Sequence, residues 1–137
     1  MHSEPTVLLV DDDEAARYLS SRLLRRLGLR RQVPQATNGH EALVLLRAAC
    51  QAGQPLPTLI LLDLNMPVLN GRELLARYAE LPAACRQATT IIVLSSTELP
   101  GEIEAVRQQA AEVVTKPLTE AVLQRLLRQY AGYEPPG

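Results

Sequence analysis

The sequence predicts an α/β fold, a doubly wound parallel sheet of five strands with helices on both faces. Short apolar segments of strand length alternate along the chain with longer segments of helical periodicity, which is typical of parallel sheets with right-handed crossovers. The apolar runs at residues 59–62 and 90–94 contain no charged residue, as expected for strands buried on both faces. The length of 137 residues and the hydrophobic content of 47% suit one domain with a substantial core.

The five predicted strands are short apolar runs bounded by polar or turn residues, at residues 6–10, 32–36, 59–62, 90–94 and 112–115. Pro34 lies in the second run. Because proline cannot donate a hydrogen bond to a neighbouring strand, this strand is expected at the sheet edge. Asp63 follows the central strand directly, and residues 66–71 contain turn signals that lead the chain away from the sheet.

Five helices are expected from apolar stripes at helical spacing, beginning near Glu14, Asn38, Gly71, Pro100 and Thr119. Gly28 is placed as the C-cap of the first helix. Asn38 is placed as the N-cap of the second, with Glu41 in position to complete a capping box. Residues 81–88 are expected to form a loop.

The globular domain is expected to span residues 6–131, between a disordered N-terminal segment (1–5) and a C-terminal tail (132–137), with no attached output domain. The net charge is −1, from 14 basic and 15 acidic residues, so the composition predicts neither nucleic-acid nor membrane binding. The one basic cluster is interpreted as a solvated helix face, and it consists of Arg22, Arg25, Arg26, Arg30 and Arg31.

The two cysteines, Cys50 and Cys85, show no metal-binding or redox spacing and are expected to be reduced thiols of a cytoplasmic protein. The first residues lack the basic-then-apolar pattern of a signal peptide, and no apolar run approaches the length needed to cross a membrane. The sequence therefore predicts a cytoplasmic location.

Polar side chains follow four of the five predicted strands. Asp11 and Asp12 follow the first strand, Asp63 the third, Ser95 the fourth and Lys116 the fifth. Since the carboxyl ends of parallel strands share one edge of the sheet, these side chains are expected to meet. Three carboxylates need a cation to offset their repulsion, and oxygen ligands without His or Cys suit Mg²⁺. Asp63 is then a candidate nucleophile toward phosphorus, with Lys116 and Ser95 available to bind phosphoryl oxygens.

These residues resemble the receiver domain of two-component response regulators. The likeness covers about residues 6–130 and rests on four pieces in order: Val10-Asp11-Asp12, Asp63-Leu64-Asn65-Met66-Pro67 with Gly71, Ser95-Ser96 and Lys116-Pro117. The string D-x-N-M-P-x-x-x-G is the specific part of this pattern. The resemblance implies a flavodoxin-like sheet of strand order 2-1-3-4-5 and a stand-alone, single-domain regulator.

The resemblance also implies how the metal is held. Asp12 and Asp63 would bind Mg²⁺ through carboxylate oxygens, Asn65 through its backbone carbonyl and Asp11 through water. Asp63 would accept a phosphoryl group from a sensor histidine kinase or a histidine phosphotransfer protein. The resulting aspartyl phosphate would act on a downstream protein that the sequence does not identify, and homodimer formation stays open.

Further roles follow for the phosphoryl-binding residues. Ser95 takes the place of the family's Ser or Thr, and the Lys116 side chain contacts the phosphoryl group. The peptide bond between Lys116 and Pro117 is expected to be cis. Asn65 and Thr97 occupy the positions that tune self-dephosphorylation. Both are small and polar, so they should not severely block the attacking water.

One departure from the family is Val113, which stands where an aromatic residue usually switches inward. A smaller conformational response, or direct recognition at the edge of the site, is therefore expected. Two alternative functions are a binding module that is independent of phosphorylation and a Mg²⁺-dependent phosphohydrolase with an Asp nucleophile. Asn65 counts against the phosphohydrolase because it cannot transfer a proton at the position where such enzymes carry a carboxylate.

Overall fold

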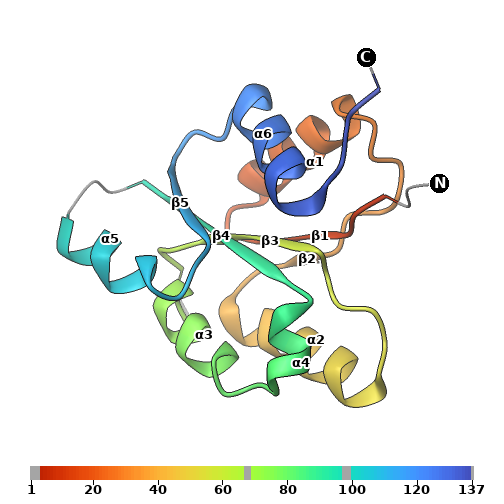
Figure 1. Cartoon of the computed structure of the whole chain (residues 1–137). Helices are drawn as coiled ribbons and strands as arrows, with labels where there is room; N and C mark the ends of the chain where they lie inside the picture. The colour runs from red at the N-terminus through yellow and green to blue at the C-terminus, as the bar shows by residue number, and fades with distance from the viewer. Residues whose placement is uncertain (1–3, 67–68, 97–99, 137) are drawn as a thin grey trace.

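The computed structural model describes residues 4–66, 69–96 and 100–136, and it contains one five-stranded parallel sheet (Figure 1). The strands are β1 (Val7–Val10), β2 (Gln35–Ala36), β3 (Leu59–Asp63), β4 (Thr90–Ser95) and β5 (Glu112–Thr115). The helices are α1 (Glu14–Arg26), α2 (Gly39–Ala52), α3 (Gly71–Tyr78), α4 (Ala83–Gln87), α5 (Pro100–Arg107) and α6 (Glu120–Ala131). The strand order is β2-β1-β3-β4-β5, all neighbours pair in parallel, and the predicted fold class and order are confirmed.

The sheet separates two layers of helices, with α1 and α6 on one face and α2, α3 and α5 on the other (Figure 1). Successive residues of the central strand point to opposite layers. Leu61 packs in the same cluster as Leu123 of α6, whereas Ile60 and Leu62 pack in the same cluster as Leu46 of α2. This two-sided burial explains why the strand sequence is apolar at every position before Asp63.

Two elements differ from the sequence prediction. The edge strand β2 comprises only Gln35–Ala36, although Pro34 still accepts a hydrogen bond from the backbone N–H of Leu9 at 3.1 Å. The edge position itself is as expected. Residues predicted as loop contain the additional helix α4, which has no buried residue and therefore no apolar stripe to signal it.

The helix caps are partly as predicted. Asn38 caps α2 and accepts a hydrogen bond from the backbone N–H of Glu41 at 2.8 Å. The Glu41 carboxylate accepts instead from the hydroxyl of Thr37, at 3.0 Å, and so does not complete a capping box. A complete capping box lies at α3, where Asn70 and Glu73 bond each other's backbone N–H groups at 2.9 and 3.1 Å. This box fixes the start of the helix that follows the central strand.

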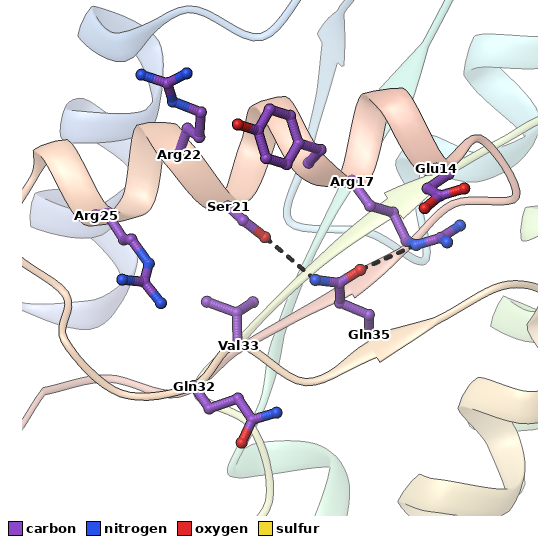
Figure 2. A pocket seen from close by; sticks show the side chains of 9 residues that line it. Glu14, Arg17, Ser21, Arg22, Arg25, Gln32, Val33 and Gln35 are labelled. Carbon is purple, nitrogen blue, oxygen red and sulfur yellow. Dashed lines mark hydrogen bonds between the residues drawn. The ribbon is translucent and has the colours of Figure 1, made fainter.

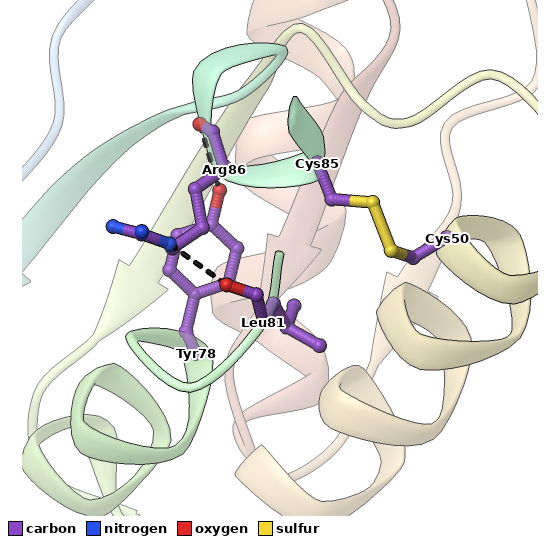
Figure 3. Close-up of a disulfide and its surroundings, with 5 residues drawn as sticks. All are labelled: Cys50, Tyr78, Leu81, Cys85 and Arg86. Carbon is purple, nitrogen blue, oxygen red and sulfur yellow. Dashed lines mark hydrogen bonds between the residues drawn. A yellow bond between two sulfur atoms is a disulfide. The ribbon is translucent and has the colours of Figure 1, made fainter. Parts of the chain in front are cut away.

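A disulfide joins Cys50 in α2 to Cys85 in α4, with the Cα atoms 5.9 Å apart (Figure 3). The expectation of reduced thiols is therefore wrong in this structure. The two residues are separated by 35 positions, so no local spacing could indicate the pairing, which the fold alone brings about. Within the described residues, no helix is long and apolar enough to cross a membrane.

The segment after α6 packs back on α1. Tyr133 donates a hydrogen bond from its hydroxyl to the carbonyl of Leu27 at 3.1 Å. The C-cap residue of α1 is Leu27, one position before the predicted Gly28. Gly28 follows it with φ of +93°. A Cβ atom on Gly28 would lie 2.7 Å from Pro136 and 2.9 Å from the Tyr133 hydroxyl, so glycine allows this close approach.

Candidate functional site

Three carboxylates meet at the carboxyl edge of the sheet. Asp11 and Asp12 follow β1, and Asp63 is the last residue of the neighbouring strand β3. One oxygen atom from each of the three lies within 4.8 Å of the others. Asp11 and Asp63 are buried, whereas Asp12 is exposed, so the cluster opens to solvent on the Asp12 side. The predicted convergence of the acidic residues is confirmed.

Lys116 bridges the two buried carboxylates. Its Nζ atom lies 3.3 Å from Oδ2 of Asp11 and 3.3 Å from Oδ1 of Asp63. Its backbone N–H donates to the carbonyl of Ser95 at 2.8 Å, which fixes the strand end that carries the lysine. The peptide bond from Lys116 to Pro117 is cis, as predicted. One cation against three carboxylates leaves a local excess of negative charge.

Electrostatics set the protonation of this cluster. Burial and the nearby Asp11 carboxylate raise the pKa of Asp63, and together they outweigh Lys116 and the Asn65 N–H, which lower it. For Lys116, burial by itself lowers the pKa, but the carboxylates of Asp63 and Asp11 outweigh burial and raise it above its ordinary value. Lys116 therefore stays charged, while the ionised form of Asp63 is disfavoured. Under these conditions, binding of a second cation at the carboxylates, or of an anion near Lys116, becomes favourable.

The remaining predicted residues lie around Asp63. The backbone N–H of Asn65 donates to Oδ1 of Asp63 at 3.2 Å, and the Asn65 side chain is exposed. Ser95 ends β4, the strand next to Asp63, and is only 1% exposed. Thr97, which the sequence analysis linked to dephosphorylation, lies outside the described residues. The other site residues predicted from the sequence all lie at this one edge of the sheet.

The loop after Asp63 is held partly by Gly39 and Leu69, to which no sequence signal pointed. Leu69 has φ of +61°, in the left-handed region that is uncommon for a residue other than glycine. Its carbonyl accepts a hydrogen bond from the N–H of Gly39, the first residue of α2, at 3.1 Å. The N–H of Gly71 donates to the carbonyl of Leu64 at 3.0 Å. These bonds close the loop against α2 and against the end of β3.

Arg17 of α1 supports the other acidic strand end. Its Nη1 donates to the backbone carbonyl of Asp11 at 2.7 Å, and its Nε donates to the side chain of Gln35 at 3.0 Å (Figure 2). Gln35 in turn donates to the hydroxyl of Ser21 at 3.2 Å. Arg17 thus ties together α1, the end of β1 and the edge strand. Its spacing from Asp11 matches no motif, so no sequence signal pointed to it.

Two arginines of the predicted basic cluster, Arg22 and Arg25, line a hollow of about 580 Å³ between α1 and the β2 edge. Arg30 and Arg31 lie beyond the end of α1. The Arg22 and Arg25 side chains project to different sides of the helix (Figure 2). Arg22 lies over the ring of Tyr18, 5.9 Å from its centroid, and both arginines are exposed. They do not converge on a common point, which agrees with the interpretation as a solvated helix face.

A second hollow, of about 380 Å³, adjoins the carboxylate site between α1 and the chain that follows β5. Its polar lining consists of Asp11, Asp13, Ser20 and Lys116. The rest of its wall is apolar: Ala16, Leu19, Leu23, Leu94, Pro117 and Leu118. Leu19 is 61% exposed although it is apolar, and its neighbour Tyr18 is 58% exposed. An apolar surface next to a charged site suits contact with another protein.

Val113, which the resemblance places at the position of a switching aromatic residue, is half-buried. Val113 lies on β5 opposite Val93 of β4 and packs against the core layer of α2, α3 and α5. Its short side chain fills that place without a ring that could move.

The sequence is similar to those of known receiver domains. The profile of the response regulator receiver domain matches residues 7–128. The chain is 32% identical over 124 residues to the positive alginate biosynthesis regulatory protein of Pseudomonas aeruginosa, an alignment that covers 90% of this chain but only 46% of that relative. It is 31% identical over 125 residues to the two-component response regulator ORR41 of Oryza sativa, covering 90% of this chain and 92% of the relative.

A solved structure shares the fold. It is the receiver domain of the sensor histidine kinase PA1611 from Pseudomonas aeruginosa, which contains a magnesium ion coordinated in its active-site cleft. The two structures align with a TM-score of 0.77 and 29% sequence identity, over 96% of this chain and 100% of that one.

Proposed function

Because the chain belongs to the response regulator receiver domain family, a family of signalling domains, we propose that residues 6–131 accept a phosphoryl group on Asp63 in a Mg²⁺-dependent reaction. The observation that carries this proposal is the placement of Asp63. It is a buried carboxylate at the end of the central strand, beside Lys116 and within 4.8 Å of two further carboxylates.

The residues present fit a magnesium ion. Three carboxylates with one lysine leave net negative charge, and the oxygen ligands come from two adjacent strand ends. We assign Asp12 and Asp63 as carboxylate ligands, Asn65 as a ligand through its backbone carbonyl and Asp11 as a ligand through water. When bound, Mg²⁺ would neutralise charge that develops on the phosphoryl oxygens.

The proposed transfer uses the carboxylate of Asp63 as the nucleophile. One of its oxygens attacks phosphorus while the bond from phosphorus to the donor nitrogen or oxygen breaks, and the donor leaves with that electron pair. Asn65 and Lys116 both contact Oδ1 of Asp63, which points to Oδ2 as the attacking oxygen. Lys116 then stabilises the transferred group, and the Ser95 hydroxyl binds one of its oxygens.

A protein donor, either a sensor histidine kinase or a histidine phosphotransfer protein, is supported by the surface around the site. The largely apolar hollow next to Asp11 and Lys116, lined by the exposed Leu19 of α1, offers a contact area beside the acceptor. Phosphorylation would draw Ser95 toward the new dianion and so alter the surface that a downstream protein reads. With Val113 in place of an aromatic ring, that alteration is expected to be small and close to the site.

The direct test is the intact mass of the protein after incubation with acetyl phosphate and Mg²⁺. One phosphoryl adduct is expected on the wild type, and none without Mg²⁺ or on Asp63→Asn. Asp13→Asn is the matched control, since Asp13 adjoins the acidic pair but only caps α1, accepting from the Ala15 N–H at 3.0 Å. That variant should be phosphorylated normally. A wild type that carries no adduct would contradict the proposal and leave the phosphorylation-independent binding module.

A further inference from the structure

We propose that Cys50 and Cys85 form a reversible thiol–disulfide exchange site that controls how firmly α4 is attached to the domain. The proposal does not depend on phosphorylation of Asp63. It rests on what the cross-link joins, on how little else holds α4, on the accessibility of the two cysteines and on their position away from the carboxylate cluster.

The cross-link joins a well-anchored helix to a weakly anchored one. Cys50 lies in the last turn of α2, a helix with four residues buried in the core. Cys85 lies in the middle of α4, a helix of five residues, none of which is buried. The residue before α4 is Pro82, and no side chain caps the helix. Packing therefore contributes little to the position of α4, and the disulfide contributes much.

Few polar contacts hold the same segment. The hydroxyl of Tyr78 donates to the carbonyl of Arg86 at 3.1 Å, and the Arg86 guanidinium donates to the carbonyl of Leu81 at 2.9 Å (Figure 3). The second of these bonds is internal to the segment. After α4, Thr89 donates to the carbonyl of Pro57 at 2.7 Å, which fixes the entry to β4. The segment between Leu81 and Thr89 can therefore loosen while β4 stays in the sheet.

A reductant can reach the two sulfur atoms. Cys50 and Cys85 are half-buried, and the residues on both sides of Cys85 are exposed. The reductant is a low-molecular-weight thiol or a dithiol protein. Its thiolate attacks one cysteine sulfur, the bond between the two cysteine sulfurs breaks, and the released thiolate takes up a proton. A second thiolate of the reductant then attacks the reductant's sulfur in the mixed disulfide, and the second cysteine leaves as a thiolate that takes up a proton. Two electrons and two protons thus convert the protein disulfide to two thiols, and the reductant leaves as a disulfide.

The exchange site lies at the end of the sheet opposite the carboxylates. Cys50 lies at the carboxyl end of α2, which leads toward the amino end of β3, and α4 leads toward the amino end of β4. Asp11 and Asp63 lie instead at the carboxyl ends of β1 and β3. Arg86 of α4 and Tyr78 of α3 also line a cavity of about 360 Å³. Release of α4 would open this cavity and change the α2–α4 surface without moving the acceptor aspartate.

The test compares oxidised and reduced full-length protein. Purified protein is equilibrated in glutathione redox buffers, free thiols are alkylated, and their number is read from the intact mass. Peptide-resolved hydrogen exchange is then measured for both forms. We expect a single reversible two-electron transition. On reduction, amide exchange at residues 79–89 should accelerate by about tenfold or more, with β1 and β3 unchanged. The double variant Cys50→Ser/Cys85→Ser should behave as the reduced form in every buffer.

Three results would overturn the proposal. Free thiols in the air-oxidised protein would show that the pair does not join. Reduction only in denaturant would show a permanent structural cross-link. Exchange that accelerates across the whole sheet, or nowhere, would show that the disulfide does not control α4 specifically. Phosphorylation of Asp63 by acetyl phosphate serves as the independent reference and should be equal in both redox forms.

Discussion

A single methyl group at Gly39 should destabilise the protein by displacing the loop that follows Asp63. Gly39 is the first residue of α2, and its N–H donates to the carbonyl of Leu69 at 3.1 Å. A Cβ atom built on Gly39 would lie 2.2 Å from that carbonyl oxygen and 3.1 Å from its carbon. Since contacts below 3.0 Å essentially never occur, the Leu69 backbone must move by the better part of an ångström.

The size of the effect follows from three contributions. Loss of the Gly39–Leu69 hydrogen bond costs about 1 kcal/mol. Forcing an extra methyl group into a packed contact costs about 1–3 kcal/mol. The better helix propensity of alanine returns up to about 1 kcal/mol, and less at the first position of a helix. Gly39→Ala should therefore lower the free energy of unfolding by about 2 kcal/mol.

Urea denaturation measures this loss. With an m-value of about 2 kcal/mol/M, the midpoint should fall by about 1 M. Gly101→Ala is the matched control, because Gly101 also lies at the start of a helix but has no atom within 4 Å of a built Cβ. It should leave stability unchanged or raise it by up to about 1 kcal/mol. Equal midpoints for the two variants would refute the steric argument.

Three further predictions concern charge and metal. In EDTA at neutral pH, Asp63→Asn should melt at a higher temperature than the wild type, because the raised pKa of Asp63 means that its ionised form opposes folding. The higher stability of the variant should shrink as pH falls below the folded pKa of Asp63 and vanish below the ordinary value of 3.8. Mg²⁺ at a hundred times its Kd should stabilise the wild type by about 2.7 kcal/mol, reversibly with EDTA, and a normal shift in Asp12→Asn would contradict the ligand assignment. The Arg125 hydrogen bond lowers the pKa of Glu112, so Glu112→Gln should cost less than about 1 kcal/mol above pH 4.5, and urea midpoints should show this cost disappearing as pH falls through the folded pKa.

The parts of the fold that sequence reasoning recovers are those governed by periodicity. Runs such as that before Asp63 are apolar at every position because both faces of β3 are covered, and parallel topology then brings Asp11, Asp63, Ser95 and Lys116 to one edge. The convergence of the site could be predicted for this reason, without knowledge of any distance.

What could not be predicted depends on contacts between segments far apart in the chain. The hydrogen bond from Gly39 to Leu69 joins α2 to a loop after β3, and Arg17 reaches a backbone carbonyl that any residue could supply. Neither leaves a pattern in the residue types. The disulfide likewise joins positions 35 apart. Helix α4 was missed because a helix held by a cross-link needs no apolar face.

The carboxylate site forms only when β3 pairs in its native register with β1 and β4. Asp63 closes a strand whose register is set against β1 from Val7 to Val10 and against β4 from Thr90 to Leu94. A slip of one residue would exchange the two core layers along the whole strand and turn the acceptor away from its neighbours. No intermediate register preserves the cluster. If the proposed magnesium site is correct, its titration would count correctly folded molecules, and the magnesium-binding stoichiometry of a preparation would measure its native fraction.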